Sequence, residues 1–369
     1  MTRRDFISTS VGGALSVGLT AAGAQGEGPP PQKVKIGLLS MAHVHARGYA
    51  DQVKGNADAE LVAVWDEVPP RGEEAAKAYN VPFVGSLEAL LALDGLAAVV
   101  VNAPTNLHHD VILRSLQAGK HVFTEKALTV TTKEADEVVA AVEASDLKFM
   151  ISLPSRCAPD CLFLKQTKDQ GAIGDVTLMR ARIAHSAALQ GWFGGYTMWF
   201  ADPVAAGGGA LFDLGCHTVD VMRWVMGAPR RVTALMNSFT KRYPDVDDNA
   251  VAVVEFESGA LGILDVAWVQ AAGPNPIEMY GTKGFAGIRG LNGRPTLQVP
   301  GAPQADQQGN VPVNDLPAGL PGPLQQWIAA IKTGSGVTIT VRDGRNLTEL
   351  LEGIYRSSRE GKAIDFPLA

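Results

Sequence analysis

The chain has 369 residues, of which 46 % are hydrophobic and 19 % are charged, so it is long and apolar enough to form two domains with their own cores. Its formal net charge of −6 argues against nucleic acid as a partner, because binding to phosphates needs a basic surface. Three cysteines are too few for a disulfide scaffold, and no apolar run reaches about 18 residues, so no transmembrane helix is predicted.

The first 32 residues predict an export signal followed by a linker. Arg3 and Arg4 precede a mildly apolar stretch at 6–19, and Ala22-Gly23-Ala24 matches a signal-peptidase site. The paired arginines resemble a twin-arginine signal cleaved after Ala24, which predicts a periplasmic or secreted protein. The alternative is a frayed basic terminus. Glycine and proline in residues 25–32 predict the linker.

Residues 33–152 predict a Rossmann-type, doubly wound dinucleotide-binding domain. Short apolar runs alternate with amphipathic stretches, which is typical of parallel βαβ units. The predicted strands are 33–39, 60–65, 97–102, 121–124 and 148–152, and the predicted helices are 45–56, 71–79, 109–118 and 132–145.

Residues 153–369 predict an α+β domain that binds substrate and mediates oligomerisation. Apolar and polar residues alternate, as in an open and mainly antiparallel sheet, and turn signals occur at Ser258-Gly259 and at 281–284. A final helix at 343–361 is expected to pack back, and the uncovered sheet face predicts a homodimer or homotetramer. The predicted strands here are 176–185, 232–239, 250–256 and 261–269.

The loop after the first predicted strand is the first candidate binding site. A dinucleotide-binding motif places glycines near positions 40, 42 and 45, where this chain has Ser40, Ala42 and His45. Asp66 ends the second strand, where a carboxylate can bind the adenosine ribose and favour NAD over NADP, or else cap a helix. His43 and His45 are two residues apart and would not share a helical face, so no metal site is predicted.

Further candidates follow the third and fourth predicted strands, because ligands of such sheets bind at the carboxyl ends of strands. Asn106 and His108 are placed to meet a ligand there, or only to shape the turn. Lys126 follows the fourth strand, and a lysine in a partly desolvated cleft has a lowered pKa that allows proton exchange near neutral pH. The alternative is a solvated surface lysine.

A Gly-rich segment at 207–220 predicts an acid–base pair. If residues 209–226 are helical, Asp213 and His217 share one face, and the carboxylate would orient the imidazole. An ordinary helix-stabilising pair is the alternative. The triple glycine at 207–209 would let the helix start press against another group, such as a nicotinamide ring.

Aromatic residues of a predicted loop at 190–201 are candidates for contact with a sugar ring. Trp192, Tyr196 and Trp199 could stack on a sugar or fill an interface. Arg156 and His185 are further candidate substrate-binding residues, and Asp247 and Asp248 are weaker ones.

These segments together resemble the Gfo/Idh/MocA family of NAD(P)-dependent sugar and polyol oxidoreductases, over residues 33–365. The resemblance rests on the APTNLHH turn, EKALT, GGGALFDLGCHTVD, GTKG and the segment at 343–362. It implies that Lys126, Asp213 and His217 are catalytic. The chain departs from the family in its glycine motif and in Ala127, which replaces the usual proline, so a trans peptide is expected there. The cofactor-binding residues expected are Gly37, Ser40, Met41, Ala42, His43, Asp66, Ala103, Pro104, Thr105, Asn106, His108, Glu125 and Lys126.

The resemblance implies an exported oxidoreductase that transfers a hydride between NAD(P) and a sugar, polyol or glycoside. A periplasm has no expected pool of free NAD, so we expect a tightly bound cofactor and a closed redox cycle. Two alternatives remain open. One is a glycoside hydrolase that works by oxidation, elimination, addition and reduction with NAD, and the other is a non-catalytic sugar-binding homologue.

Overall fold

The computed structural model describes residues 32–368 of the chain. The predicted export signal, its cleavage site and nearly all of the predicted linker lie outside the described residues. Among the residues that are described, no helix combines the length and the apolar run needed to cross a bilayer.

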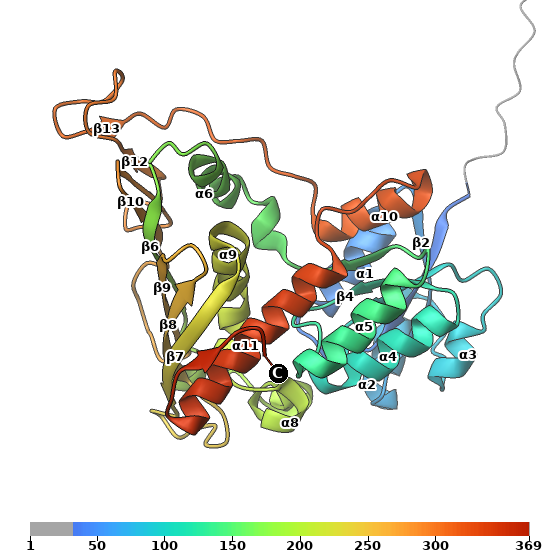
Figure 1. Ribbon diagram of the computed structural model, residues 1–369. Helices are drawn as coiled ribbons and strands as arrows, with labels where there is room; N and C mark the ends of the chain where they lie inside the picture. Colours follow the sequence, from blue (N-terminus) through green and yellow to red (C-terminus); the bar gives the residue numbers. More distant parts are fainter. Residues whose placement is uncertain (1–31, 369) are drawn as a thin grey trace, which may run out of the picture. The chain divides into compact units, whose positions relative to one another are not determined.

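The first sheet has five parallel strands in the order β2-β1-β3-β4-β5, with helices on both sides (Figure 1). Its strands are almost fully buried, as expected when both faces of a parallel sheet are covered. The predicted strands are confirmed to within about two residues, and the short helix α3 was not predicted. The elements are β1 (Val34–Leu39), α1 (Ala46–Gly55), β2 (Ala59–Trp65), α2 (Pro69–Tyr79), α3 (Leu87–Leu91), β3 (Ala98–Val101), α4 (Thr105–Gln117), β4 (His121–Thr124), α5 (Thr132–Glu143) and β5 (Phe149–Ile151).

The remaining helices lie between the two sheets or along the second one, except for the helix at 323–333, which packs against the first sheet. Six of them were not predicted: η1 (Pro154–Cys157), α6 (Pro159–Asp169), α7 (Ala187–Gln190), η2 (Gly195–Ala201), α8 (Pro203–Ala206) and α10 (Pro323–Thr333). The others are η3 (Leu211–Gly215), α9 (Cys216–Met226) and α11 (Val341–Glu360).

The second sheet has nine strands in the order β13-β12-β11-β10-β6-β9-β8-β7-β14. All of its pairings are antiparallel except that of β6 with β9, so the predicted fold class is confirmed. The turn at Gly259 joins β8 to β9, and the turn at 281–284 joins β10 to β11, as predicted. The strands are β6 (Val176–Ala184), β7 (Pro229–Asn237), β8 (Asn249–Phe256), β9 (Leu261–Ala267), β10 (Ile277–Gly281), β11 (Phe285–Ile288), β12 (Thr296–Gln298), β13 (Asn310–Val311) and β14 (Ile364–Asp365).

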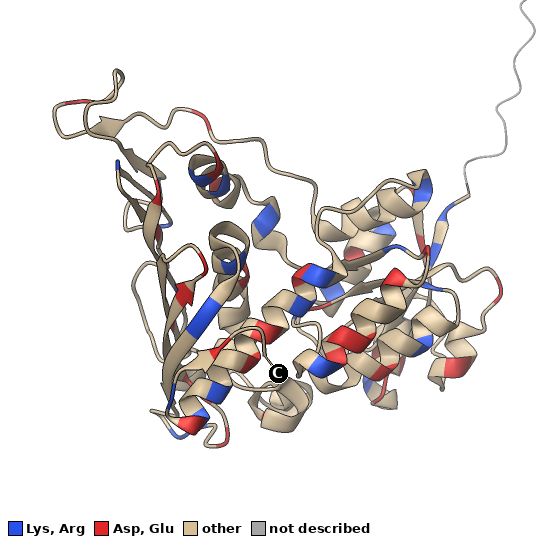
Figure 2. Cartoon of the chain, viewed as in Figure 1, with Lys and Arg blue, Asp and Glu red and all other residues tan. Residues whose placement is uncertain are grey.

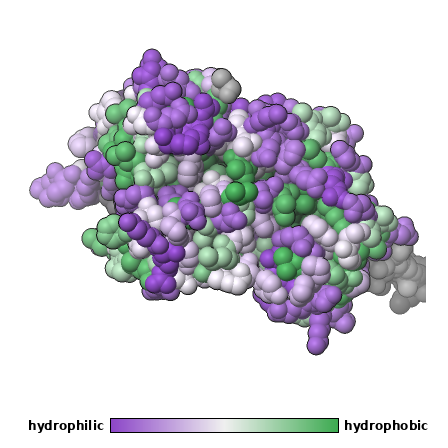
Figure 3. All heavy atoms as spheres, turned by 90° about the horizontal axis from the view of Figure 1, so that it is seen from below, coloured by the Kyte–Doolittle hydropathy of each residue, from purple (hydrophilic) through white to green (hydrophobic). Residues whose placement is uncertain are grey.

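One face of this sheet is covered by helices, whereas the other carries exposed apolar side chains. Leu235, Val251, Val253 and Leu261 are exposed, and strand alternation with the observed register places all four on the same face. Hydrophobic and hydrophilic residues are interspersed on the molecular surface seen from below (Figure 3). The predicted oligomer surface stays a prediction.

Helix α11 connects the two domains. It contacts α5 of the first domain and β7 of the second sheet. Charged residues of both signs lie along α11 and α5 (Figure 2), where Arg345 pairs with Asp136 at 2.7 Å. Gly344 allows close packing, since a Cβ there would lie 3.2 Å from the Cβ of Leu128.

A buried ion pair network joins η1, α9 and α11. Arg156 is only 6 % exposed, and its guanidinium binds Asp220 at 2.6 Å and Asp343 at 2.7 Å. The prediction that Arg156 binds substrate is therefore wrong, because these two carboxylates engage its guanidinium away from the pocket described below. Its role is to hold three elements together.

We expect Arg156→Met to lower the free energy of unfolding by about 3–5 kcal/mol, because it leaves two carboxylates without their cation. Urea denaturation at pH 7.5 measures the change. Arg231→Met is the matched control, since Arg231 forms an exposed pair with Asp365 and its loss should change stability little. Equal effects of the two substitutions would contradict the assigned role.

Candidate functional site

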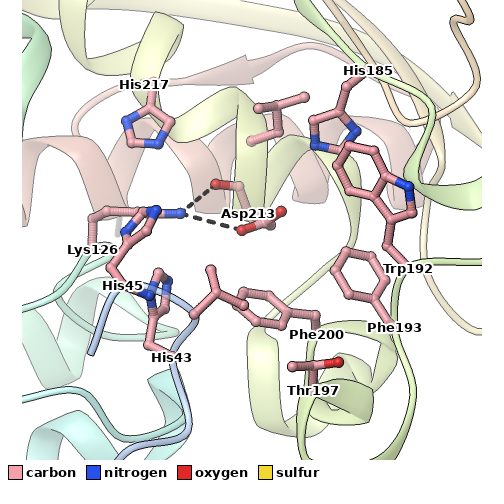
Figure 4. Close-up of a pocket in the computed structure, with 12 residues that line it drawn as sticks. His43, His45, Lys126, His185, Trp192, Phe193, Thr197, Phe200, Asp213 and His217 are labelled. Carbon is pink, nitrogen blue, oxygen red and sulfur yellow. Dashed lines mark hydrogen bonds and ion pairs between the residues drawn. The ribbon is translucent and has the colours of Figure 1, made fainter. Parts of the chain in front are cut away.

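The candidate site lies where the carboxyl ends of β1, β3 and β4 meet at one edge of the first sheet. The loops that follow these strands carry His43 and His45, Thr105, and Lys126 respectively. A pocket of about 230 Å³ opens beside them and is completed by residues of the second domain (Figure 4). The pocket is lined by His43, Val44, His45, Lys126, His185, Trp192, Phe193, Thr197, Phe200, Asp213, Leu214 and His217.

Lys126 forms a polar contact between the two domains inside the pocket. Its Nζ donates to the backbone carbonyl of Asp213 at 2.6 Å and to the Asp213 carboxylate at 3.2 Å. Burial alone would lower the pKa of Lys126, but the acidic groups of Cys216, Asp213 and Glu125 outweigh it and raise this pKa. The predicted lowered pKa is wrong, because the desolvated lysine has carboxylate partners. Lys126 is a fixed ammonium group.

Asp213 lies in the π-helical turn η3, not in an α-helix as predicted. The wider turn changes the i,i+4 relation, and no hydrogen bond joins Asp213 to His217 in the described part of the chain. The prediction that Asp213 orients His217 is therefore wrong: it binds Lys126 instead. The triple glycine also has another partner than predicted, since a Cβ on Gly209 would lie 2.0 Å from the carbonyl oxygen of Asp247.

His217 faces the pocket from the start of α9 (Figure 4). Burial, followed by the charge of Lys126, lowers the pKa of His217 to about 3. The imidazole is therefore neutral at physiological pH and can accept a proton only transiently.

His43, His45 and Glu125 form a cluster that the sequence did not predict. The two histidines precede α1, so the helical spacing rule does not apply, and their ring centroids lie 4.6 Å apart. His45 Nδ1 lies 2.9 Å from Glu125 Oε1, and His43 Nε2 lies 3.7 Å from Glu125 Oε2. Tyr49 donates to the same carboxylate at 2.5 Å. An H-x-H pair at a helix start, facing an acid after another strand, is the signal that could have revealed this cluster.

The three potential ligand atoms of this cluster lie within 4.8 Å of one another, which is close enough for a metal ion. The hydrogen bonds argue against that use. The backbone N–H of His45 donates to His43 Nδ1 at 3.2 Å, so a neutral His43 carries its proton on Nε2. A protonated Nε2 offers no lone pair to a metal. We therefore assign the cluster to hydrogen bonding.

The loop between β1 and α1 is held by the end of β2. Asp66 accepts from the backbone N–H of Met41 at 2.8 Å and from Nε of Arg71 at 2.9 Å. Its carboxylate is thus already engaged, and it is 2 % exposed, which limits its predicted contact with a ribose. Arg71 was not predicted. Gly37 is wrongly predicted to bind the cofactor, because it lies within β1, where a Cβ would be 2.9 Å from Leu90 Cδ2.

The same edge of the first sheet has buried polar atoms without a hydrogen-bond partner, and a bound dinucleotide would supply one. Among the described residues, Asn102 Oδ1 and His43 Nε2 are buried at this edge without a hydrogen-bond partner. Both lie beside the loop predicted to bind the cofactor, with the amide of Asn102 donating to Ser40 at 3.3 Å. Thr105 and Lys126 line a small second cavity next to His43. Ala103 and Pro104 precede Thr105, and Asn106 follows it exposed on α4.

His108 does not meet a ligand as predicted. It is buried within α4, and its ring nitrogens lie 2.9 Å from the carbonyl oxygen of Ala127 and 3.0 Å from that of Ala103. These backbone contacts connect the loop after β3 to the loop after β4. The Lys126–Ala127 peptide is cis, whereas a trans peptide was expected.

The predicted aromatic residues divide between two environments. Trp192 lines the pocket and stacks on His185 with ring centroids 4.7 Å apart. Trp199 instead donates its Nε1–H to the carbonyl of Ala42 at 3.1 Å, and the Arg71 guanidinium lies 5.6 Å from the centre of the Tyr196 ring. Tyr196 and Trp199 therefore contact the predicted cofactor loop and its support, not the main pocket. Phe193, Thr197 and Phe200 line the pocket and were not predicted.

We expect the protein to lose stability as the pH falls below about 6.5. Burial lowers the pKa of His43, His108 and His217 in the folded protein, so the unfolded chain binds more protons in this range. Each such histidine removes up to about 1.4 kcal/mol for each pH unit between the unfolded and the folded pKa. For His217 that window runs from about 6.5 down to about 3.

Urea denaturation between pH 5 and 7 tests this expectation. His217→Asn should flatten the dependence by close to one proton per molecule. Gln52→Ala is the control, since Gln52 is exposed on α1 and carries no titratable group, so its loss should leave the slope unchanged. An unchanged slope in His217→Asn would show that the imidazole is not held neutral.

Comparison with known proteins places these observations in a family. A model described as "Oxidoreductase family, NAD-binding Rossmann fold" matches residues 34–153, and a model described as "GFO/IDH/MocA C-terminal domain" matches residues 162–286. Inositol 2-dehydrogenase of Rhizobium meliloti is 27 % identical over 90 % of this chain and 98 % of its own length. Levoglucosan dehydrogenase of Pseudarthrobacter phenanthrenivorans is 24 % identical over 91 % of this chain and 99 % of its own length.

The solved structures agree with these matches. The structure of GenD2 from gentamicin A biosynthesis, in complex with NAD, is 26 % identical with a TM-score of 0.75 and covers 91 % of this chain and 97 % of its own. The fold of this chain is thus shared over nearly its full length with a protein whose structure holds NAD. The chain belongs to the Gfo/Idh/MocA family of oxidoreductases with an NAD-binding Rossmann domain.

Proposed function

We propose that the protein oxidises a secondary hydroxyl group of a sugar or polyol with NAD. The observation that carries this proposal is the pocket itself, where the Lys126 ammonium, fixed by Asp213, and the neutral His217 face one cavity. Two relatives of nearly full length bear the names of inositol and levoglucosan dehydrogenases, which supports this substrate class.

The chain's own groups divide the work of polarisation and proton transfer. The Lys126 ammonium would donate a hydrogen bond to the substrate oxygen and stabilise the negative charge that develops there. Asp213 fixes the position of this ammonium group. His217 would accept the hydroxyl proton, because it is neutral and faces the same cavity. His185 and Trp192 would form the far wall against the sugar ring.

A bound NAD would supply the hydride acceptor. The residues that would hold it are those of the loop at 40–43 and of the turn at 102–105, with Asn102 and His43 offering unsatisfied polar atoms. Asp66 and Glu67 bring two carboxylates to the end of β2 and share one cation, Arg71, so a net charge of about −1 remains there and would disfavour a 2′-phosphate. We therefore propose a preference for NAD over NADP.

We further propose that the protein is exported through its twin-arginine signal and retains its cofactor. The pattern of residues 1–24 supports export. In a compartment without a supply of free NAD, a retained cofactor must be reduced by one substrate and oxidised by another. We also propose that the exposed apolar face of β7, β8 and β9 forms a contact between identical subunits, because removing apolar surface from water is favourable.

Oxidation of myo-inositol, levoglucosan, glucose and glycerol is tested by reduction of the bound NAD to NADH, and kcat is measured with a second sugar added to reoxidise the cofactor. We expect Lys126→Met and His217→Asn each to lower kcat by about 10²–10⁴-fold, because each removes a group that acts on the reacting hydroxyl. Lys133→Met, an exposed substitution on α5, is the control. Unchanged kcat in both site variants would refute the assigned roles.

Cofactor retention is tested by denaturing the purified protein and measuring the nucleotide released by absorbance and mass spectrometry. We expect NAD or NADH, and little NADP. With the cofactor-free protein, NAD should bind at least about tenfold more tightly than NADP, as measured by protein fluorescence. Recovery of NADP alone would contradict the inferred role of Asp66 and Glu67.

A further inference from the structure

His45 is a pocket residue for which the reaction described above has no use. It follows the loop after β1, half of its side chain is exposed, and it lines the same cavity as Lys126 and His217 (Figure 4). Its Nδ1 contacts Glu125 at 2.9 Å. No hydrogen bond of its Nε2 is found within residues 32–368, so this atom is available to solvent or ligand.

Glu125 is held as a carboxylate by the groups around it. Tyr49 donates to its Oε1 at 2.5 Å, and the backbone N–H of Lys126 donates to its Oε2 at 3.0 Å. His43 Nε2, which carries a proton, lies 3.7 Å from Oε2. Burial would raise the pKa of Glu125, but the imidazoles of His43 and His45 and the ammonium of Lys126 hold it well below its usual range.

An ionised Glu125 determines which nitrogen of His45 carries the proton. A carboxylate accepts and does not donate, so the 2.9 Å contact requires a proton on His45 Nδ1. The neutral ring then presents the lone pair of Nε2. This is the arrangement by which a carboxylate orients a histidine for proton transfer.

The proposed oxidation needs a group of this kind. Lys126 is already an ammonium and has no room for another proton. His217 is a weak base in this site and cannot hold a proton at neutral pH. The released proton must therefore leave the buried end of the pocket, and His45 stands at its exposed side.

We propose that His45 Nε2 receives the proton released by the substrate hydroxyl and passes it to solvent, with Glu125 as the positioning residue. This inference rests on the proposed function. The O–H bond of the substrate breaks and its proton passes to His217. The carbon that bears this oxygen loses its hydrogen as a hydride to NAD, and the alcohol becomes a ketone. The proton then moves from His217 through pocket water to His45 Nε2, and from there to bulk water or buffer. The groups that surround His45 during this step are His43, Tyr49, Glu125, Lys126 and His217.

The first test measures turnover of His45→Gln with NAD and the best substrate of the panel, in weak buffer at pH 7.5. We expect kcat to fall by about a hundredfold and to recover as imidazole is added, because a free imidazole can replace the missing carrier in the open pocket. Wild type and His109→Gln should not respond to imidazole. His109 is the matched control because it also pairs with a glutamate, Glu137, but at the surface. A loss of activity that imidazole does not restore would overturn the proposal.

The second test needs no substrate. In ¹⁵N-histidine NMR spectra, the signals of His45 are identified by their absence in His45→Gln. We expect the neutral tautomer with the proton on Nδ1, and we expect Glu125→Gln to weaken this preference and shift the pH profile of kcat. A proton on Nε2 in the wild type would overturn the proposal even if the dehydrogenase activity is found. Absence of NADH formation in wild type with the expected tautomer present would instead reject the proposed function, and with it the reaction that His45 would serve.

Discussion

The contact between Lys126 and Asp213 connects the two parts of this molecule at the point where chemistry can occur. Lys126 follows β4 of the parallel sheet, whereas Asp213 lies in the π-helical turn before α9. Each partner limits what the other can do. The carboxylate keeps the lysine charged in a buried position, and the described contacts of the carboxylate are with the lysine and not with His217. The site therefore contains a permanent positive charge beside a neutral imidazole, which suits the stabilisation of an alkoxide better than the storage of a proton.

Because neither Lys126 nor His217 can hold the released proton, the pair of Glu125 and His45 provides a second acid–base group in the pocket. Glu125 is adjacent to Lys126 in the chain, but its side chain faces His43, His45 and Tyr49. Two neighbouring residues after one strand thus serve two groups of partners. The donors around Glu125 offset the cost of burying its charge, and a half-exposed histidine connects that buried carboxylate to the pocket. Proton acceptance and proton release become tasks of different histidines.

Much of the fold could be predicted from the sequence because it depends on local periodicity. The strands of the first sheet are short apolar runs, and the hairpin turn at Gly259 carries its own signal. The site residues were predicted less well, because their roles depend on partners that are distant in the sequence. Arg156 was assigned to substrate, yet Asp220 and Asp343 bind it in the interior. Asp213 was assigned to His217 through α-helical spacing, which a π-turn invalidates.

The missing glycines of the cofactor loop show how one backbone conformation can be reached by another residue. Ser40 stands where a dinucleotide-binding motif has its first glycine, and its φ of 74° lies in the left-handed region that glycine favours. Such a conformation costs a non-glycine residue about 1–3 kcal/mol, so the surrounding structure must hold it. Several contacts do so: the Ser40 N–H donates to the carbonyl of Trp65 at 2.7 Å, and its hydroxyl accepts from the N–H of Ala42 at 3.1 Å. Arg71, anchored on Asp66, reaches the same hydroxyl at 3.3 Å. The loop thus has the backbone conformation that glycine would adopt, and hydrogen bonds hold Ser40 in it. The sequence departure at this position is therefore compatible with a working nucleotide site.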